Sequence, residues 1–183
     1  MDIIFVIDSS DDVTDTEFQF VKHTLAKLTP AVLGSNNNVR IGAVVYGSRI
    51  TKMISLSNNA TSLVRSFQEI TPSKGHNKPY LGILAGRGAF LSSIGTIKVI
   101  AFVASGFQQY TKLAAEQAML AKRDGIRVVG IGYGDLALKE DFTEVSSTRY
   151  MVSIYKNAVE LYEKAEKLPS DICRGEYLHL CNV

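Results

Sequence analysis

Runs of consecutive apolar, often β-branched residues recur along the chain and alternate with segments whose apolar residues lie three or four positions apart. The continuous runs are typical of strands buried on both faces of a sheet, and the spaced pattern is typical of helices with one buried side. We expect buried strands at residues 3–7, 39–46, 98–104 and 126–131, and a short last strand at 150–152. This alternation predicts a mostly parallel sheet covered by helices.

Helices are expected between these strands. The first has apolar residues at helical spacing from Phe18 onward, can begin at a cap formed by Thr14 or Asp15, and is expected to end at Pro30. The other helices are expected at residues 62–70, 79–91, 110–124, 142–146 and 157–168. Right-handed crossovers would place these helices on both faces of the sheet.

Residues 50–56 alternate between apolar and polar side chains and follow the strand at 39–46 after a tight turn at Gly47 and Ser48. This pattern predicts an antiparallel hairpin. The expected fold class is therefore α/β, with a doubly wound, mostly parallel sheet, one antiparallel edge strand and helices on both faces. We expect one domain over residues 1–170 and a C-terminal tail, residues 171–183, that carries both cysteines.

Composition narrows the class of protein. The chain has 183 residues, of which 46% are hydrophobic and 21% charged, with a formal net charge of +2. These values are those of an ordinary globular domain. Because the sequence has no dense block of Lys and Arg, we expect no nucleic-acid partner. Because no apolar run is long enough to cross a bilayer, we expect no membrane insertion.

Three loops follow or face the carboxyl ends of the expected strands: residues 8–12, 73–78 and 105–109. Ligands of open α/β sheets bind at this edge. None of these loops has the glycine pattern of a dinucleotide or phosphate site. The three histidines fall on different kinds of element, so no catalytic triad can be assembled. We therefore expect a protein that is not an enzyme.

Four segments occur in a characteristic order along the chain. They are the first strand with the loop Asp8-Ser9-Ser10-Asp11-Asp12 after it, the strand Arg40-Ile41-Gly42-Ala43-Val44-Val45-Tyr46, and the apolar segments at 98–103 and 125–132. Together they resemble a von Willebrand factor A domain over roughly residues 2 to 170. That resemblance implies a metal-ion-dependent adhesion site, in which Asp-x-Ser-x-Ser, a Thr and an Asp from three loops hold Mg²⁺.

The resemblance assigns residues to this site. Asp8 and Ser10 match the first two positions, and Asp12 stands where the second Ser belongs. The Thr position falls on Lys78 and the third-loop Asp position on Ser105. These departures predict a degenerate site.

The expected role of Lys78 follows from its charge. An ammonium fixed within ~4 Å of a divalent cation opposes binding by several kcal/mol. We therefore expect no cofactor, with the Lys78 ammonium bridging Asp8 and Asp12. In the alternative interpretation, Asp8, Ser10 and Asp12 hold a rebuilt Mg²⁺ or Ca²⁺ site. A further alternative for Asp8 is a structural role, in which its carboxylate caps the following helix.

The resemblance also implies a partner and a location. We expect a secreted module of a larger multidomain matrix or adhesion protein that binds a matrix component such as collagen. The ligand-binding face is expected to comprise Asp8, Ser10, Asp12, His76, Lys78 and Ser105. An intracellular scaffold domain is the alternative from another class.

Two further features bear on location. Cys173 and Cys181 can form a short-loop disulfide, as in an oxidising compartment, or stay as two unrelated thiols. Asn59-Ala60-Thr61 is an acceptor sequence for N-linked glycosylation. Both features are consistent with an extracellular glycoprotein.

Overall fold

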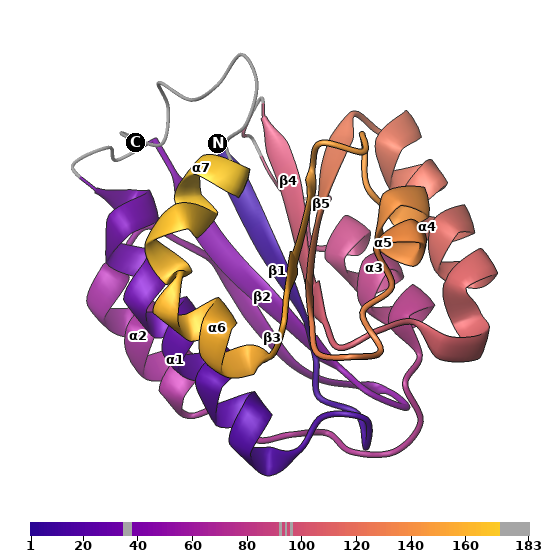
Figure 1. Ribbon diagram of the computed structural model, residues 1–183. Coiled ribbons are helices and arrows are strands. Elements are labelled where there is room, and N and C mark those ends of the chain that lie inside the picture. The colour runs from indigo at the N-terminus through magenta and orange to yellow at the C-terminus, as the bar shows by residue number, and fades with distance from the viewer. Residues whose placement is uncertain (35–37, 92, 94, 96, 173–183) are drawn as a thin grey trace.

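A six-stranded sheet with the order β3-β2-β1-β4-β5-β6 forms the centre of the computed structural model, which describes residues 1–34, 38–91, 93, 95 and 97–172 (Figure 1). Every neighbouring pair of strands is parallel except β2 and β3, which are antiparallel. The strands are β1 (Asp2–Asp8), β2 (Arg40–Tyr46), β3 (Ile50–Ser57), β4 (Lys98–Ala104), β5 (Ile126–Tyr133) and β6 (Val152–Tyr155).

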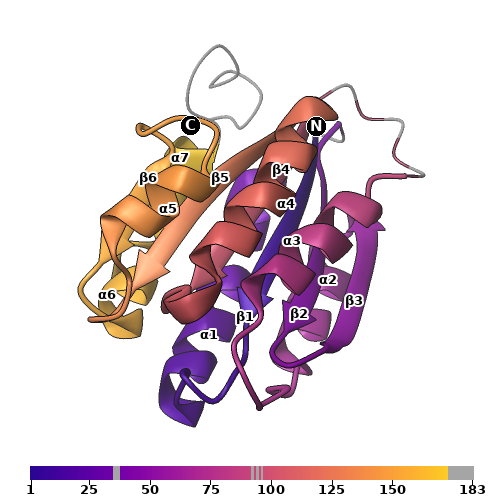
Figure 2. The same cartoon turned by 90° about the vertical axis from the view of Figure 1, so that its right-hand side faces the viewer.

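Helices cover both faces of this sheet (Figures 1 and 2). One face is covered by α1 (Asp15–Leu33), α2 (Ala60–Gln68), α6 (Ala158–Glu163) and α7 (Leu168–Ile172). The other is covered by α3 (Pro79–Gly88), α4 (Thr111–Arg123) and α5 (Lys139–Val145). Successive side chains of β1 enter different halves of the core: Phe5 packs on the α1 side, whereas Ile4 and Val6 pack on the α3 side. The predicted fold class is therefore confirmed.

The predicted end of the first helix is wrong. Thr14 caps α1 as expected, but the helix continues past Pro30 to Leu33, and the N–H of Gly34 closes it by donating to Pro30 O at 2.9 Å. Proline removes one helical hydrogen bond. The last turn nevertheless forms because Val32 and Leu33 are buried in the core, and that burial outweighs the lost bond.

The other helices and the last strand also differ from their predicted bounds. The helices expected at residues 62–70, 110–124 and 142–146 lie at 60–68, 111–123 and 139–145, and the strand expected at 150–152 lies at 152–155. The helix expected at residues 79–91 ends at Gly88. The helix expected at residues 157–168 is divided into α6, a 3-10 turn (η2, Ala165–Lys167) and α7. The buried Asp171 of α7 accepts a hydrogen bond from Ser153 Oγ of β6 at 2.8 Å, so the packed structure extends beyond residue 170.

Candidate functional site

Asp8 is the last residue of β1, at the edge of the sheet where β1, β2 and β4 end together. Because β1 lies between β2 and β4, the order of the strands reverses beside it. In open α/β sheets such a reversal leaves a crevice in which ligands bind. The loops after β1 and β4 and the loop before α3 therefore form the candidate site.

The Asp8 side chain is completely buried. Its Oδ1 accepts a hydrogen bond from the Ser10 backbone N–H at 3.0 Å. Its Oδ2 accepts hydrogen bonds from Asn77 Nδ2 at 3.2 Å and Ser105 Oγ at 3.3 Å. Burial raises the pKa of Asp8 to about 6, the hydrogen bond from Ser10 opposes this shift, and the charge of Asp12 adds to it. The site is thus centred on a desolvated carboxyl group.

Hydrogen bonds hold the loop after β1 against the loop before α3. Ser9 O accepts from the Lys74 backbone N–H at 2.8 Å, and the Asp11 backbone N–H donates to Gly75 O at 2.9 Å. Ser9 Oγ lies 2.8 Å from Ser73 Oγ. These contacts fix the second loop over the end of β1. The sequence did not single out either serine, because hydroxyls in loops have no distinguishing spacing.

Asn77, and not Lys78, contacts Asp8, so the predicted Lys78 bridge between Asp8 and Asp12 is wrong by one residue. No salt bridge of Lys78 is found among the described residues. Lys78 is the N-cap of α3, and Pro79 at the first helical position keeps its backbone non-helical. Neighbouring side chains then diverge: Asn77 is buried, and Lys78 is half-buried.

Three buried oxygens of this cluster lack a hydrogen-bond partner within the described part of the chain: Ser10 Oγ, Asp12 Oδ2 and Asn77 Oδ1. Leaving a buried polar atom unpaired costs about 1–3 kcal/mol. Mg²⁺ and Ca²⁺ are held by carboxylate, hydroxyl and amide oxygens. The residues present therefore fit a divalent cation.

The donor set is nevertheless unusual. Among residues 1–34, 38–91, 93, 95 and 97–172, no group of three or more His, Cys, Asp or Glu side chains is arranged to hold a metal ion. A cation beside Asp8 and Asp12 would therefore depend on serine and asparagine oxygens as well.

The other predicted face residues lie at the same edge. Ser105 is buried and contacts Asp8, as its place in the sequence suggested. His76 is exposed on the loop before α3 and faces solvent. Of the expected face, Ser10 and Ser105 donate hydrogen bonds to Asp8, and Asp12 is near enough for its charge to raise the pKa of Asp8. No hydrogen bond from His76 or Lys78 to Asp8 is found among the described residues.

An apolar rim adjoins this cluster. Leu136 and Leu138, in the loop after β5, are 53% and 56% exposed, while Ala137 between them is buried. The loop packs so closely that a Cβ added to Gly106 would lie 2.5 Å from Leu136 O. Gly106 O in turn accepts a hydrogen bond from Asn77 Nδ2 at 3.1 Å. Two exposed leucines therefore stand next to the polar site on a fixed loop.

Two buried tyrosines, Tyr46 at the end of β2 and Tyr133 at the end of β5, extend the polar cluster. Burial raises the pKa of both well above its usual range, and the charge of Asp8 contributes to both shifts. Neither hydroxyl has a hydrogen-bond partner in the part of the chain described. The sequence did not indicate them, because a tyrosine ending a buried strand is typical of a core.

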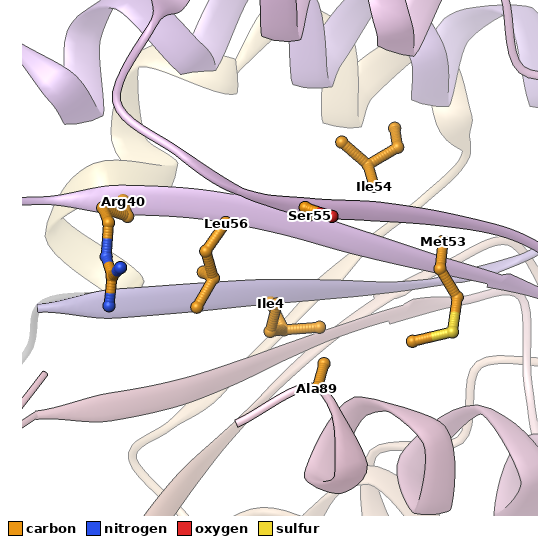
Figure 3. Close-up of a pocket in the computed structure, with 7 residues that line it drawn as sticks. All are labelled: Ile4, Arg40, Met53, Ile54, Ser55, Leu56 and Ala89. Carbon is orange, nitrogen blue, oxygen red and sulfur yellow. The ribbon is translucent and has the colours of Figure 1, made fainter. Parts of the chain in front are cut away.

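Asn59 is exposed and lies away from this edge, after the end of β3. Cys173 and Cys181, with their expected disulfide, lie outside the described residues. A separate cavity of about 240 Å³ is lined by Arg40, Ala89 and residues of β1 and β3 (Figure 3). Its lining does not include any residue of the Asp8 cluster. No described helix is both long and apolar enough to span a membrane.

Comparison with known proteins identifies relatives of this arrangement. A profile of the von Willebrand factor type A domain matches residues 2–164. Chicken (Gallus gallus) matrilin-1 is 27% identical over 177 residues, which cover 91% of this chain and 35% of matrilin-1. The mouse (Mus musculus) collagen alpha-5(VI) chain is 24% identical over 184 residues, which cover 95% of this chain and 7% of that protein. The chain thus spans about a third or less of these relatives.

Solved structures share the fold. Proximal thread matrix protein 1 from the mussel byssus, in a structure described as having a zinc-occupied metal-ion-dependent adhesion site, superposes with a TM-score of 0.83 at 18% identity. The match covers 94% of this chain and 48% of that one. The pilus adhesin SpaC of Lactobacillus rhamnosus GG superposes with a TM-score of 0.78 at 11% identity, covering 94% and 30%.

Proposed function

The chain belongs to the von Willebrand factor type A domain family, and from that premise we propose that it is a non-enzymatic, cation-dependent protein-binding module of a secreted matrix or adhesion protein. Its partner is a matrix component such as collagen, bound at the Asp8 edge of the sheet. Matrilin-1 and the collagen VI chain among its relatives support the matrix setting.

The main evidence for a cation site is the set of buried oxygens around Asp8 that lack a hydrogen-bond partner among the described residues. Asp8, Asp12, Ser10, Asn77 and Ser105 would hold the ion. A bound Mg²⁺ or Ca²⁺ would supply a hard positive charge that attracts a carboxylate of the partner. The zinc described in the mussel protein supports a cation at this edge.

The sequence predicted that Lys78 contacts Asp8, but the structure places Asn77 there. This difference favours the metal-binding interpretation of the site over the metal-free one. An ammonium beside Asp8 would neutralise the carboxylate and exclude a divalent ion. Asn77 brings an amide with no charge, and its Oδ1 lacks a partner among the described residues. A neutral amide in contact with Asp8 therefore supports the proposed cation.

The rim formed by Leu136 and Leu138 supplies the second half of the binding face. Interface centres combine apolar contacts with a few fixed polar groups. An exposed aliphatic pair next to a cation site fits a partner that presents a carboxylate flanked by apolar side chains. The close packing of Gly106 against the Leu136 loop limits the ordering needed on binding.

Calorimetric titration of the chelator-treated chain with MgCl₂, CaCl₂ and ZnCl₂, separately, tests the cation. We expect saturable binding that Asp12→Ala removes and Asp15→Ala preserves. Asp15 is a matched control because its carboxylate is exposed and paired with Lys74 at 2.6 Å. If none of the three ions shows saturable binding, the proposed cation site is overturned.

Solid-phase binding to triple-helical collagen tests the partner. We expect binding in MgCl₂ that EDTA abolishes. Collagen binding that persists in EDTA would support a protein-binding module but contradict its dependence on a cation. Cation binding without collagen binding would contradict collagen as the partner.

A further inference from the structure

β3 is an open edge of the sheet, paired only with β2 among the described strands. Its eight residues, Ile50–Ser57, include a single charged side chain, Lys52. Met53 is 54% exposed, and it lines the cavity on the α3 side together with Leu56, while Ile54 points to the opposite face (Figure 3). An exposed edge with few charges can pair with the edge of another chain.

The acceptor sequence Asn59-Ala60-Thr61 begins two residues beyond this edge strand. Asn59 and Thr61 are both exposed. Asn59 is also the N-cap of α2, and its Oδ1 accepts a hydrogen bond from the Ser62 backbone N–H at 2.9 Å.

The cap and a glycan use different atoms of Asn59. In N-glycosylation the amide nitrogen Nδ2 loses one proton and bonds to the anomeric carbon of a polyprenyl-diphosphate-linked oligosaccharide, whose carbon–oxygen bond to the diphosphate breaks. Oδ1 is unchanged, so the hydrogen bond to the Ser62 N–H is preserved. The folded structure therefore accommodates a glycan without loss of the helix cap.

We propose that Asn59 carries an N-linked glycan that shields the uncharged end of the β3 edge. The proposal rests on the extracellular location proposed above. Ser57 pairs with Ile41, at the end of the sheet where β1 begins, whereas Asp8 lies at the other end. Ile41 is level with Ile3, and the five residue steps from Ile3 to Asp8 along β1 separate the two levels by roughly 17 Å. A glycan at Asn59 thus covers the edge strand and leaves the candidate binding site open.

Secretion of the chain from mammalian cells behind a signal peptide tests occupancy, with intact mass measured before and after treatment with peptide N-glycosidase F. We expect the enzyme to remove the mass of one glycan. Asn59→Asp keeps an oxygen cap for α2 but has no amide nitrogen, and Thr61→Ala keeps Asn59 itself. Both variants should be secreted with unchanged circular dichroism and without a glycan. An unmodified parent chain would overturn the proposal.

Sedimentation velocity at rising protein concentration tests shielding. The glycosylated chain should stay monomeric, whereas the deglycosylated chain and Asn59→Asp should self-associate. Adding Met53→Lys to Asn59→Asp should restore the monomer, since it places a second charge on the edge strand. A deglycosylated chain that stays monomeric would overturn shielding. Because neither measurement uses a cation or collagen, failure of the proposed function would not affect them.

Discussion

Asn77 Nδ2 donates a hydrogen bond to Asp8 Oδ2 at 3.2 Å and a second one to Gly106 O at 3.1 Å. One amide thus joins the end of β1 to the loop after β4, and its Oδ1 is left without a partner among the described residues. An amide oxygen is a ligand for hard cations, whereas an ammonium at this position would repel them. In the proposed cation site, this residue would therefore contribute a neutral oxygen and no competing positive charge.

Replacement of Asn77 tests this relationship. Asn77→Ala removes an oxygen ligand and the two hydrogen bonds that its amide nitrogen donates. We expect Mg²⁺ affinity to fall by at least the roughly 10-fold typical of lost outer-shell partners. The free energy of unfolding should fall by about 1–3 kcal/mol, since buried acceptors lose their donor. Calorimetric titration and urea denaturation in EDTA measure the two effects.

Lys78→Ala is the matched control for this variant. Lys78 is adjacent in sequence but makes no salt bridge in the described ranges. Its removal should leave Mg²⁺ affinity within about twofold, because the charge is half-exposed and screened by solvent. A gain in Mg²⁺ affinity of tenfold or more, about 1.4 kcal/mol, would instead support the bridging ammonium expected from the sequence.

Asp8→Asn separates a binding role of Asp8 from a structural one. The carboxylate is completely buried, and no salt bridge to it is found among residues the structure describes. Burying an unpaired charge is unfavourable, so its neutral isostere should leave the free energy of unfolding in EDTA unchanged within about 1 kcal/mol or raise it. Mg²⁺ binding should be lost. A loss of stability above about 2 kcal/mol would show that Asp8 mainly caps the loop and helix.

Most of the fold could be predicted from the sequence because buried parallel strands are apolar on both faces. The strand Lys98–Ala104 has its predicted bounds, and the hairpin of β2 and β3 is antiparallel as expected. Helix ends were less predictable, since they depend on tertiary packing. Pro30 illustrates this: its local effect is to stop a helix, but burial of Val32 and Leu33 carries α1 one turn further.

The candidate site was predictable only in part. Asp8, Ser10 and Asp12 follow a strand directly, so their place at the sheet edge follows from the strand itself. The loop before α3 has no such anchor. Its position is set by contacts such as that between Ser9 and Ser73, 64 residues apart in the chain. The sequence-based assignment was off by one residue in this loop, so it placed the Lys78 ammonium beside Asp8 where the structure has the neutral Asn77 amide. That difference is why the sequence predicted a site without metal.

The apolar rim should contribute to partner binding without affecting the cation. Each of Leu136 and Leu138 is about half exposed, so covering it by a partner is worth about 1 kcal/mol. The double variant Leu136→Ser/Leu138→Ser should bind collagen roughly tenfold to thirtyfold more weakly, with unchanged Mg²⁺ affinity.

Met119→Ser is the control for this double variant. Met119 is 45% exposed on α4 and outside the candidate site, so collagen binding should not change. Equal binding by all three proteins would exclude the leucine rim from the interface. A parallel loss of Mg²⁺ affinity in the double variant would mean that the leucines support the loop and not the partner.

Stability at low pH should depend on Asp2, at the opposite end of β1 from Asp8. Arg40 donates to Asp2 through Nε at 2.9 Å and through a terminal nitrogen at 2.6 Å, and Ser93 Oγ adds a third hydrogen bond. Burial alone would raise the pKa of Asp2, but these hydrogen bonds and the charge of Arg40 lower it below 3.8. The ionised carboxylate therefore stabilises the folded state.

The sign of the pH effect follows from this lowered pKa. A carboxyl group whose pKa is lower in the folded state stabilises the protein above its unfolded pKa, and that contribution disappears as the pH falls through the folded value. Asp2→Asn should lower the free energy of unfolding at pH 7 by about 1–2 kcal/mol, because Arg40 is one-third exposed and its charge is partly screened. Urea denaturation of both proteins between pH 7 and 2 should show this difference shrinking below about pH 4. A difference that stays constant down to pH 2 would mean that Asp2 acts through packing and not through its charge.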